Sequence, residues 1–150
     1  MLTFTVPGEP VPQGSLRSVG RGRFVSDNPK LKGWRLKVNQ VFNLTHRGKT
    51  IEGAVELRAV FVMPRPKSHY GTGRNAGRIR EACLDLPHTV KPDGDKLLRS
   101  IGDALTTGKE QIGAYPDDAC IVRATTEKRY TRPGEEPHAQ ITLLPALGVT

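Results

Sequence analysis

Apolar and polar residues alternate in several short stretches of the chain, which predicts a sheet built of short strands. Apolar side chains recur at every second position over residues 2–6 and again over residues 55–61, and prolines follow both stretches. A period of two places alternate side chains on one face of a strand. Residues 120–126 and 139–144 are also apolar and β-branched enough to form strands. The polar stretch 127–137 between them contains a Pro-Gly pair and indicates a hairpin.

Two other stretches have the spacing of amphipathic helices. Asn28 and Pro29 are typical of an N-cap and a first helical position, and the apolar spacing after them predicts a helix that ends at about Leu44. Trp34 lies on the apolar stripe of this helix, so we assign it to the core. Residues 91–105 begin extended and end helical, because the apolar residues of their second half fall on one stripe. These residues are Leu97, Leu98, Ile101, Ala104 and Leu105.

The order of these elements, β-α-β-α-β-β, predicts one small α+β domain over residues 1–150. We expect a mixed sheet of about four strands with two main helices packed on it. Two glycine-rich basic segments, about 14–26 and 64–90, are predicted to be flexible loops. Residues 146–150 are predicted to be a frayed tail.

The net charge of +8 is unevenly distributed along the chain. Residues 1–50 hold nine Lys and Arg against two acids, whereas residues 101–150 hold five against seven. Such a basic surface fits a polyanion and fits a merely solvated face about equally well. The candidate DNA contacts are Arg17, Arg21, Arg23, Arg65, Lys67, Arg74, Arg78, Arg80 and Lys91.

Several classes of protein are disfavoured by the composition. No apolar run approaches the roughly 20 residues of a membrane span, and residues 1–6 do not resemble the start of a signal peptide, so we expect a cytoplasmic protein. Cys83 and Cys120 are isolated, and we expect reduced thiols. A zinc site formed by these cysteines with His69 and His88 matches no common ligand spacing.

Two pairs of aspartates are the strongest chemical signal. Asp93 and Asp95 lie at the expected start of the second helix, and Asp117 and Asp118 precede an apolar strand. Aspartates at these places could simply cap a helix and form a turn. Two adjacent acids repel each other unless a cation lies nearby, and Mg²⁺ prefers carboxylate oxygens. A calcium-binding EF-hand is excluded because the twelfth position from Asp93 is Ala104 rather than glutamate.

The segment from Lys91 to Leu105 resembles the block K-P-D-x-D-N-L-x-K-x-x-x-D-A-L of the RusA Holliday-junction resolvases of bacteria and their phages. Residues Asp117 to Val122 resemble the D-D-x-Q-V block of the same family. The resemblance implies a RusA-like fold and a homodimeric, Mg²⁺-dependent endonuclease, with Mn²⁺ able to substitute. Such an enzyme resolves four-way DNA junctions by paired symmetric nicks in recombination and repair, in a bacterial cell and encoded by the bacterium or a phage.

The resemblance also implies roles for individual residues. Asp93, Asp95 and Asp118 match the metal-binding acids of the family, Asp117 would add a metal ligand, and Asp103 would support them. Arg99 stands where the family has a catalytic lysine, and Lys96 stands where it has asparagine, so both become candidates to stabilise phosphate charge. Cys120 replaces the glutamine of the second block, and Lys128 is a further supporting residue.

Two alternatives remain open from the residues alone. The basic residues could belong to a non-catalytic DNA- or RNA-binding module in which the acids only cap and turn. His88, which lies just before the acidic block, could serve as a general base, although metal-bound water does not require one.

Overall fold

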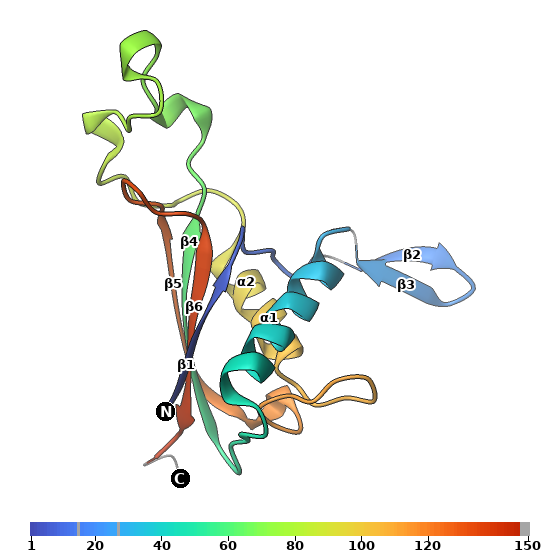
Figure 1. The fold of residues 1–150 in the computed structure, drawn as a ribbon. Helices are drawn as coiled ribbons and strands as arrows, with labels where there is room; N and C mark the ends of the chain where they lie inside the picture. Colours follow the sequence, from blue (N-terminus) through green and yellow to red (C-terminus); the bar gives the residue numbers. More distant parts are fainter. Residues whose placement is uncertain (15, 27, 148–150) are drawn as a thin grey trace.

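The computed structural model describes residues 1–14, 16–26 and 28–147, apart from the side chains of residues 16–17 and 25–26. Figure 1 shows a twisted sheet with two helices on one face, a ribbon that projects from the helical side, and a long excursion beyond one end of the sheet. The small α+β architecture predicted from the sequence is confirmed. Its helices are α1 (Leu31–His46) and α2 (Gly94–Ala104), and its sheet consists of β1 (Leu2–Pro7), β4 (Val55–Met63), β5 (Ile121–Tyr130) and β6 (His138–Pro145).

The four strands lie in the order β1-β6-β4-β5. β6 runs antiparallel to both β1 and β4, whereas β4 and β5 are parallel. The predicted hairpin of the last two strands is therefore wrong, because β6 lies between β1 and β4. The reason is burial: Ala139, Ile141 and Leu143 of β6 are 0% exposed, which suits a central strand, whereas five of the ten residues of β5 are exposed and one is buried, which suits an edge.

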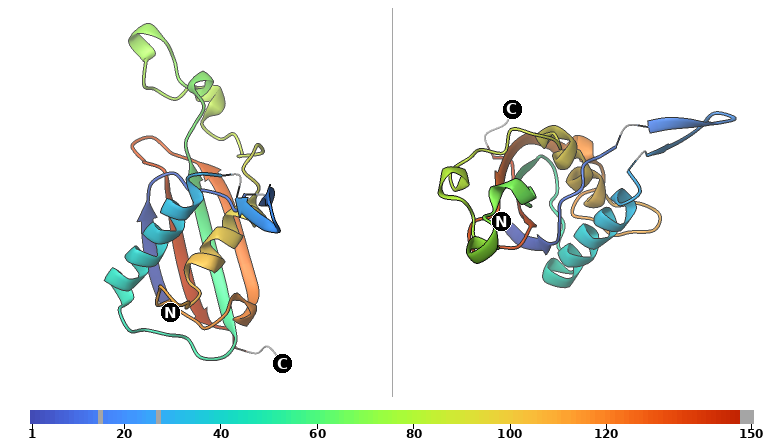
Figure 2. Two further views of the ribbon diagram at one scale, coloured as in Figure 1. Left: turned by 90° about the vertical axis from the view of Figure 1, so that its right-hand side faces the viewer. Right: turned by 90° about the horizontal axis from the view of Figure 1, so that it is seen from above.

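Both helices lie on the same face of the sheet (Figure 2), and their buried residues belong to the core. α1 buries Trp34 in the core, as the spacing predicts, and its Phe42 ring lies 5.6 Å from that of Phe4 on β1. α1 begins after the predicted position, because the Asn28 side chain accepts a hydrogen bond from the Lys30 amide at 3.1 Å in a turn before the helix. α2 buries the predicted stripe, with Leu98 only partly covered.

The first basic segment is not the loop that its composition predicts. It forms two antiparallel strands, β2 (Leu16–Gly20) and β3 (Arg23–Ser26), which pair only with each other (Figure 1). We call residues 16–26 the β2–β3 ribbon. The glycines on either side of Arg21 both have positive φ and allow a tight turn between β-forming side chains. The local turn geometry therefore outweighs the loop-like composition.

The second basic segment, residues 64–90, forms the long excursion beyond the end of the sheet, and we call these residues the excursion. It contains three short 3₁₀ turns. Its base is held by Arg65, which is 9% exposed and donates to the carbonyl oxygens of Thr131, Cys83 and Leu84 at 2.8, 2.6 and 3.1 Å. The Arg65 guanidinium also lies 5.3 Å from the centre of the Tyr130 ring. A buried arginine thus ties the excursion to the end of β5.

The predicted frayed tail is wrong at its start, because Ala146 is buried and its amide donates to the carbonyl oxygen of Ala54 at 2.9 Å. Leu147 is 82% exposed, and the remaining residues of that prediction, 148–150, lie outside the described residues.

Candidate active site along helix α2

The start of α2 carries two exposed carboxylates that lack strong partners. Asp93 occupies the N-cap position with extended backbone, φ −69° and ψ 140°, but its side chain makes no capping hydrogen bond. Asp95 lies in the first turn, where the positive end of the helix dipole favours an anion. Capping alone therefore does not account for Asp93, whose carboxylate remains available to a ligand.

Lys128 of β5 holds the segment that leads into this helix. Its Nζ donates to the carbonyl oxygens of Val90 and Pro92 at 2.8 and 3.0 Å, and Pro92 directly precedes Asp93. A Cβ added to Gly94 would lie 3.3 Å from Cγ2 of Thr126, so α2 begins close against β5. The supporting residue expected from the family pattern is thus in direct contact with the backbone of the acidic segment.

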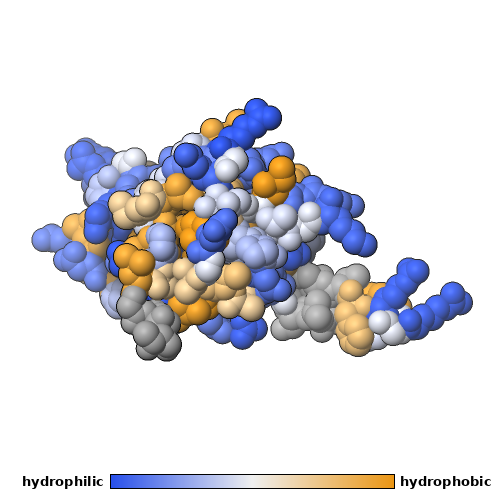
Figure 3. Space-filling view, turned by 90° about the horizontal axis from the view of Figure 1, so that it is seen from below, coloured by the Kyte–Doolittle hydropathy of each residue, from blue (hydrophilic) through white to orange (hydrophobic). Residues whose placement is uncertain are grey.

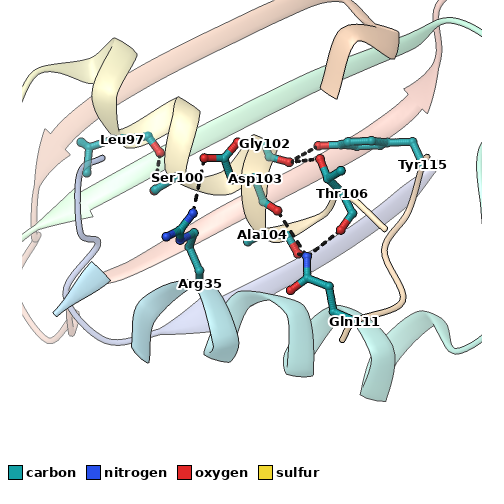
Figure 4. Close-up of polar contacts among 9 residues, drawn as sticks. All are labelled: Arg35, Leu97, Ser100, Gly102, Asp103, Ala104, Thr106, Gln111 and Tyr115. Carbon is teal, nitrogen blue, oxygen red and sulfur yellow. Dashed lines mark hydrogen bonds and ion pairs between the residues drawn. The ribbon is translucent and has the colours of Figure 1, made fainter. Parts of the chain in front are cut away.

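Farther along α2, Arg99 and Asp103 follow Asp95 at intervals of four and share its side of the helix. Asp95 Oδ2 lies 4.0 Å from Arg99 Nη2, and both side chains are largely exposed. Asp103 Oδ2 lies 3.5 Å from Nη1 of Arg35 on α1 (Figure 4). The sequence analysis missed Arg35, and no local signal could have revealed it, because its partner is 68 positions away.

Asp117 and Asp118 lie beside the other end of α2. Asp117 accepts a hydrogen bond from the Ala119 amide at 2.8 Å, so this aspartate does cap a short turn, as the simpler alternative proposes. Asp118 packs against the helix, since a Cβ added to Gly102 would lie 4.0 Å from the Asp118 Cβ. Partial burial, together with Asp117 and Asp103, raises the pKa of Asp118 above its usual range. Negative charge is therefore crowded at this point.

Tyr115 fixes the backbone beneath these acids. It is 1% exposed, and its hydroxyl donates to the carbonyl oxygen of Gly102 at 2.9 Å, an acceptor that it shares with Thr106 (Figure 4). Burial and the charges of Asp118 and Asp103 raise the pKa of the Tyr115 phenol. The hydroxyl therefore stays protonated at neutral pH and acts as a permanent donor.

The aspartates thus form two groups at opposite ends of α2. Asp93 and Asp95 lie at its start and Asp103, Asp117 and Asp118 at its end, and eight helical residues correspond to about 12 Å. Within the described part of the chain, no three His, Cys, Asp or Glu side chains are arranged as ready ligands for a metal ion. The donor chemistry nevertheless fits Mg²⁺, which commonly takes one or two carboxylates and completes its coordination with water and substrate phosphate. Burial raises the pKa of Asp118 most, and the repulsion from Asp117 and Asp103 that adds to this shift is what a cation would relieve.

Most of the candidate DNA contacts are exposed. They are Arg21 and Arg23 on the β2–β3 ribbon, Lys67, Arg74, Arg78 and Arg80 on the excursion, and Lys91 before α2. The side chain of Arg17 lies outside the described residues. Arg65 is a correction: its guanidinium is buried against the carbonyl oxygens of Thr131, Cys83 and Leu84, so it is not exposed for a phosphate contact.

The two histidines of the excursion pack on one tyrosine. The rings of His69 and His88 lie 4.8 and 4.6 Å from the Tyr130 ring, and burial lowers the pKa of both. A buried His88 is poorly placed for the general-base alternative. The two histidines and two cysteines do not form a metal-ligand group among the described residues, so the zinc alternative gains no support.

Comparison with known proteins agrees with the sequence blocks. The sequence profile of the family described as Endodeoxyribonuclease RusA matches residues 7–143. No curated protein matches the chain. None of the described helices is both long enough and apolar enough to cross a membrane.

Proposed function

Because the chain belongs to the RusA endodeoxyribonuclease family, we propose that it is a Mg²⁺-dependent enzyme that resolves Holliday junctions by paired, symmetric nicks. The observation that carries this proposal is the two groups of carboxylates at the ends of α2. Asp93 has no capping bond, Asp95 has only a 4.0 Å contact with Arg99, and the pKa of Asp118 is raised by partial burial together with Asp117 and Asp103. Carboxylates that lack strong partners are free to bind a cation, and Mg²⁺ prefers such oxygen ligands.

The carboxylates of Asp93, Asp95 and Asp118 would hold Mg²⁺ or Mn²⁺, with Asp117 and Asp103 in support. When held by these carboxylates, such an ion would supply a water of lowered pKa and positive charge beside the scissile phosphate. Lys128 keeps the backbone before Asp93 in place through its two carbonyl contacts. Arg99 and Lys96 lie on the same helix and can stabilise charge that develops on the phosphate.

Binding would rely on phosphate contacts from the exposed basic residues of the β2–β3 ribbon and of the excursion, and would therefore weaken steeply with salt. We propose a homodimer, because a four-way junction has approximate two-fold symmetry and two opposed strands must be cut. In keeping with its family, we propose that the enzyme acts in DNA recombination and repair in the cytoplasm of a bacterial cell.

The test compares Asp95→Asn with Asp85→Asn, the same change at an exposed acid in the excursion. We expect Asp95→Asn to bind a synthetic four-way junction normally in EDTA but to lose Mg²⁺-dependent cleavage, while Asp85→Asn cuts like the wild type. Normal cutting by Asp95→Asn would refute the site. Equal cutting of linear duplex and junction would indicate a general nuclease, and binding without any nicking would favour the non-catalytic module.

A further inference from the structure

The β2–β3 ribbon exposes apolar side chains that serve no packing purpose in the domain. Phe24 is 62% exposed and Val19 is 51% exposed, and neither belongs to the core. The residue directly opposite Phe24 is Ser18, whose side chain is too small to cover the ring. Figure 3 shows the ribbon extending away from the body, with apolar surface beside strongly hydrophilic side chains.

The charge of the ribbon indicates which class of partner binds this apolar surface. Residues 16–26 include three arginines and no Asp or Glu. Arg21 lies at the tip with a φ of 52° and is the one non-glycine residue of the described chain with positive φ. A side chain rarely adopts this conformation, and residues held in it cluster at functional positions. The tip therefore presents a guanidinium where a glycine would be easier to accommodate.

Arginine beside an exposed aromatic ring is the chemistry of nucleic-acid binding. Guanidinium groups contact phosphates, and aromatic side chains stack on bases. A second ribbon of the same charge would be repelled, which disfavours contact between two copies at this surface. A two-stranded ribbon also has the width of a DNA groove, and four or five residues of strand reach about 15 Å.

An aromatic ring can stack on a base only where the base stack is interrupted. In linear duplex every base face is covered by its neighbours, whereas at a branch point the terminal base pairs of each arm can lose a stacking partner. We infer that Phe24 stacks on a base at the branch point of the junction while Arg21 and Arg23 hold the adjacent phosphates. This inference rests on the proposed function and identifies the residue that distinguishes branched from linear DNA.

The experiment measures equilibrium binding in EDTA, where no cleavage occurs, to a four-way junction and to a linear duplex of the same sequence. We expect Phe24→Ala to weaken junction binding about tenfold, equivalent to about 1.4 kcal/mol, and to leave duplex binding within about twofold. Phe24→Trp should retain the junction preference. Leu44→Ala is the matched control, because Leu44 is an 86% exposed apolar residue on α1.

A second measurement reports stacking directly. With 2-aminopurine at the branch point, wild type and Phe24→Trp should change its fluorescence on binding, and Phe24→Ala should not. A Phe24→Ala protein with unchanged junction preference and unchanged fluorescence response would overturn the inference. A Phe24→Ala protein that changes oligomeric state in sedimentation would also overturn it, in favour of a contact between copies. If wild type itself does not prefer the junction, the proposed function fails instead.

Discussion

Replacement of Arg65 by methionine is expected to destabilise the protein rather than remove a DNA contact. The side chain is 9% exposed, and its guanidinium donates to the carbonyl oxygens of Thr131, Cys83 and Leu84 at 2.8, 2.6 and 3.1 Å. Each hydrogen bond from a charged donor contributes about 1.5–3 kcal/mol, and the ring contact with Tyr130 contributes about 1 kcal/mol. Because such contributions overlap, we expect a loss of about 3–5 kcal/mol in the free energy of unfolding.

Urea unfolding followed by circular dichroism measures this loss. Amide hydrogen exchange should become faster over residues 66–86, where the turns are held by the hydrogen bonds from Arg65 to the carbonyl oxygens of Cys83 and Leu84. Arg65→Lys should recover only part of the stability, because an ammonium cannot reproduce the planar fork. The matched control is Arg78→Met in the exposed part of the same excursion.

Arg78→Met should leave the free energy of unfolding within about 0.5 kcal/mol of the wild type and weaken DNA binding in a salt-dependent manner. The reasoning would be refuted if Arg65→Met kept wild-type stability and lost junction affinity to the same extent as Arg78→Met. In that case Arg65 would be a phosphate contact, as its position in the basic segment first indicated.

Three further predictions follow from individual contacts. A bidentate hydrogen bond from Arg129 lowers the pKa of Glu135 to about 2, so this pair stabilises the fold fully above pH 4.5, and its contribution is lost as the pH falls toward 2. In urea unfolding at a series of pH values, Glu135→Gln should make the free energy of unfolding less dependent on pH over this range. Lys128→Met should accelerate hydrogen exchange just before α2 and slow single-turnover cleavage about tenfold or more, and an unchanged rate would show that the two carbonyl contacts do not position the acids. Burial lowers the pKa of His88 below 6.5, so the unfolded chain binds more protons than the folded chain, and the free energy of unfolding should decrease as the pH falls below 6.5. In parallel urea titrations, His88→Gln should show a smaller decrease.

Local patterns predicted the elements, and distant contacts account for what was missed. The alternation over residues 55–61 and the stripe that begins at Leu97 are complete within one strand or helix, so period alone identifies them. The partner of β6 is chosen by burial across the whole sheet, and no short window contains that information. The same limit explains Arg65, whose composition-based assignment ignored a carbonyl acceptor 66 positions away.

In the acidic site too, the sequence predicted the local arrangement but not the contacts between distant segments. The sequence blocks identified Asp93 and Asp95 together, and the structure places them at the N-cap and in the first turn of α2. That Asp118 lies beside Gly102 depends on how β5 runs along the helix, which a motif cannot specify. The ligand set of Asp93, Asp95 and Asp118 therefore stays a prediction for the DNA-bound enzyme.

The position of β6 between β1 and β4 has a consequence for how the protein is made. A ribosome releases β1 first and β4 next, yet neither can pair with the strand between them until residues 138–145 have been synthesised. Until then the nascent chain exposes two apolar strands with open hydrogen-bonding edges, which are attractive to other chains. Closure of the sheet is thus a late event in synthesis, and the cell must keep the unfinished polypeptide from aggregating.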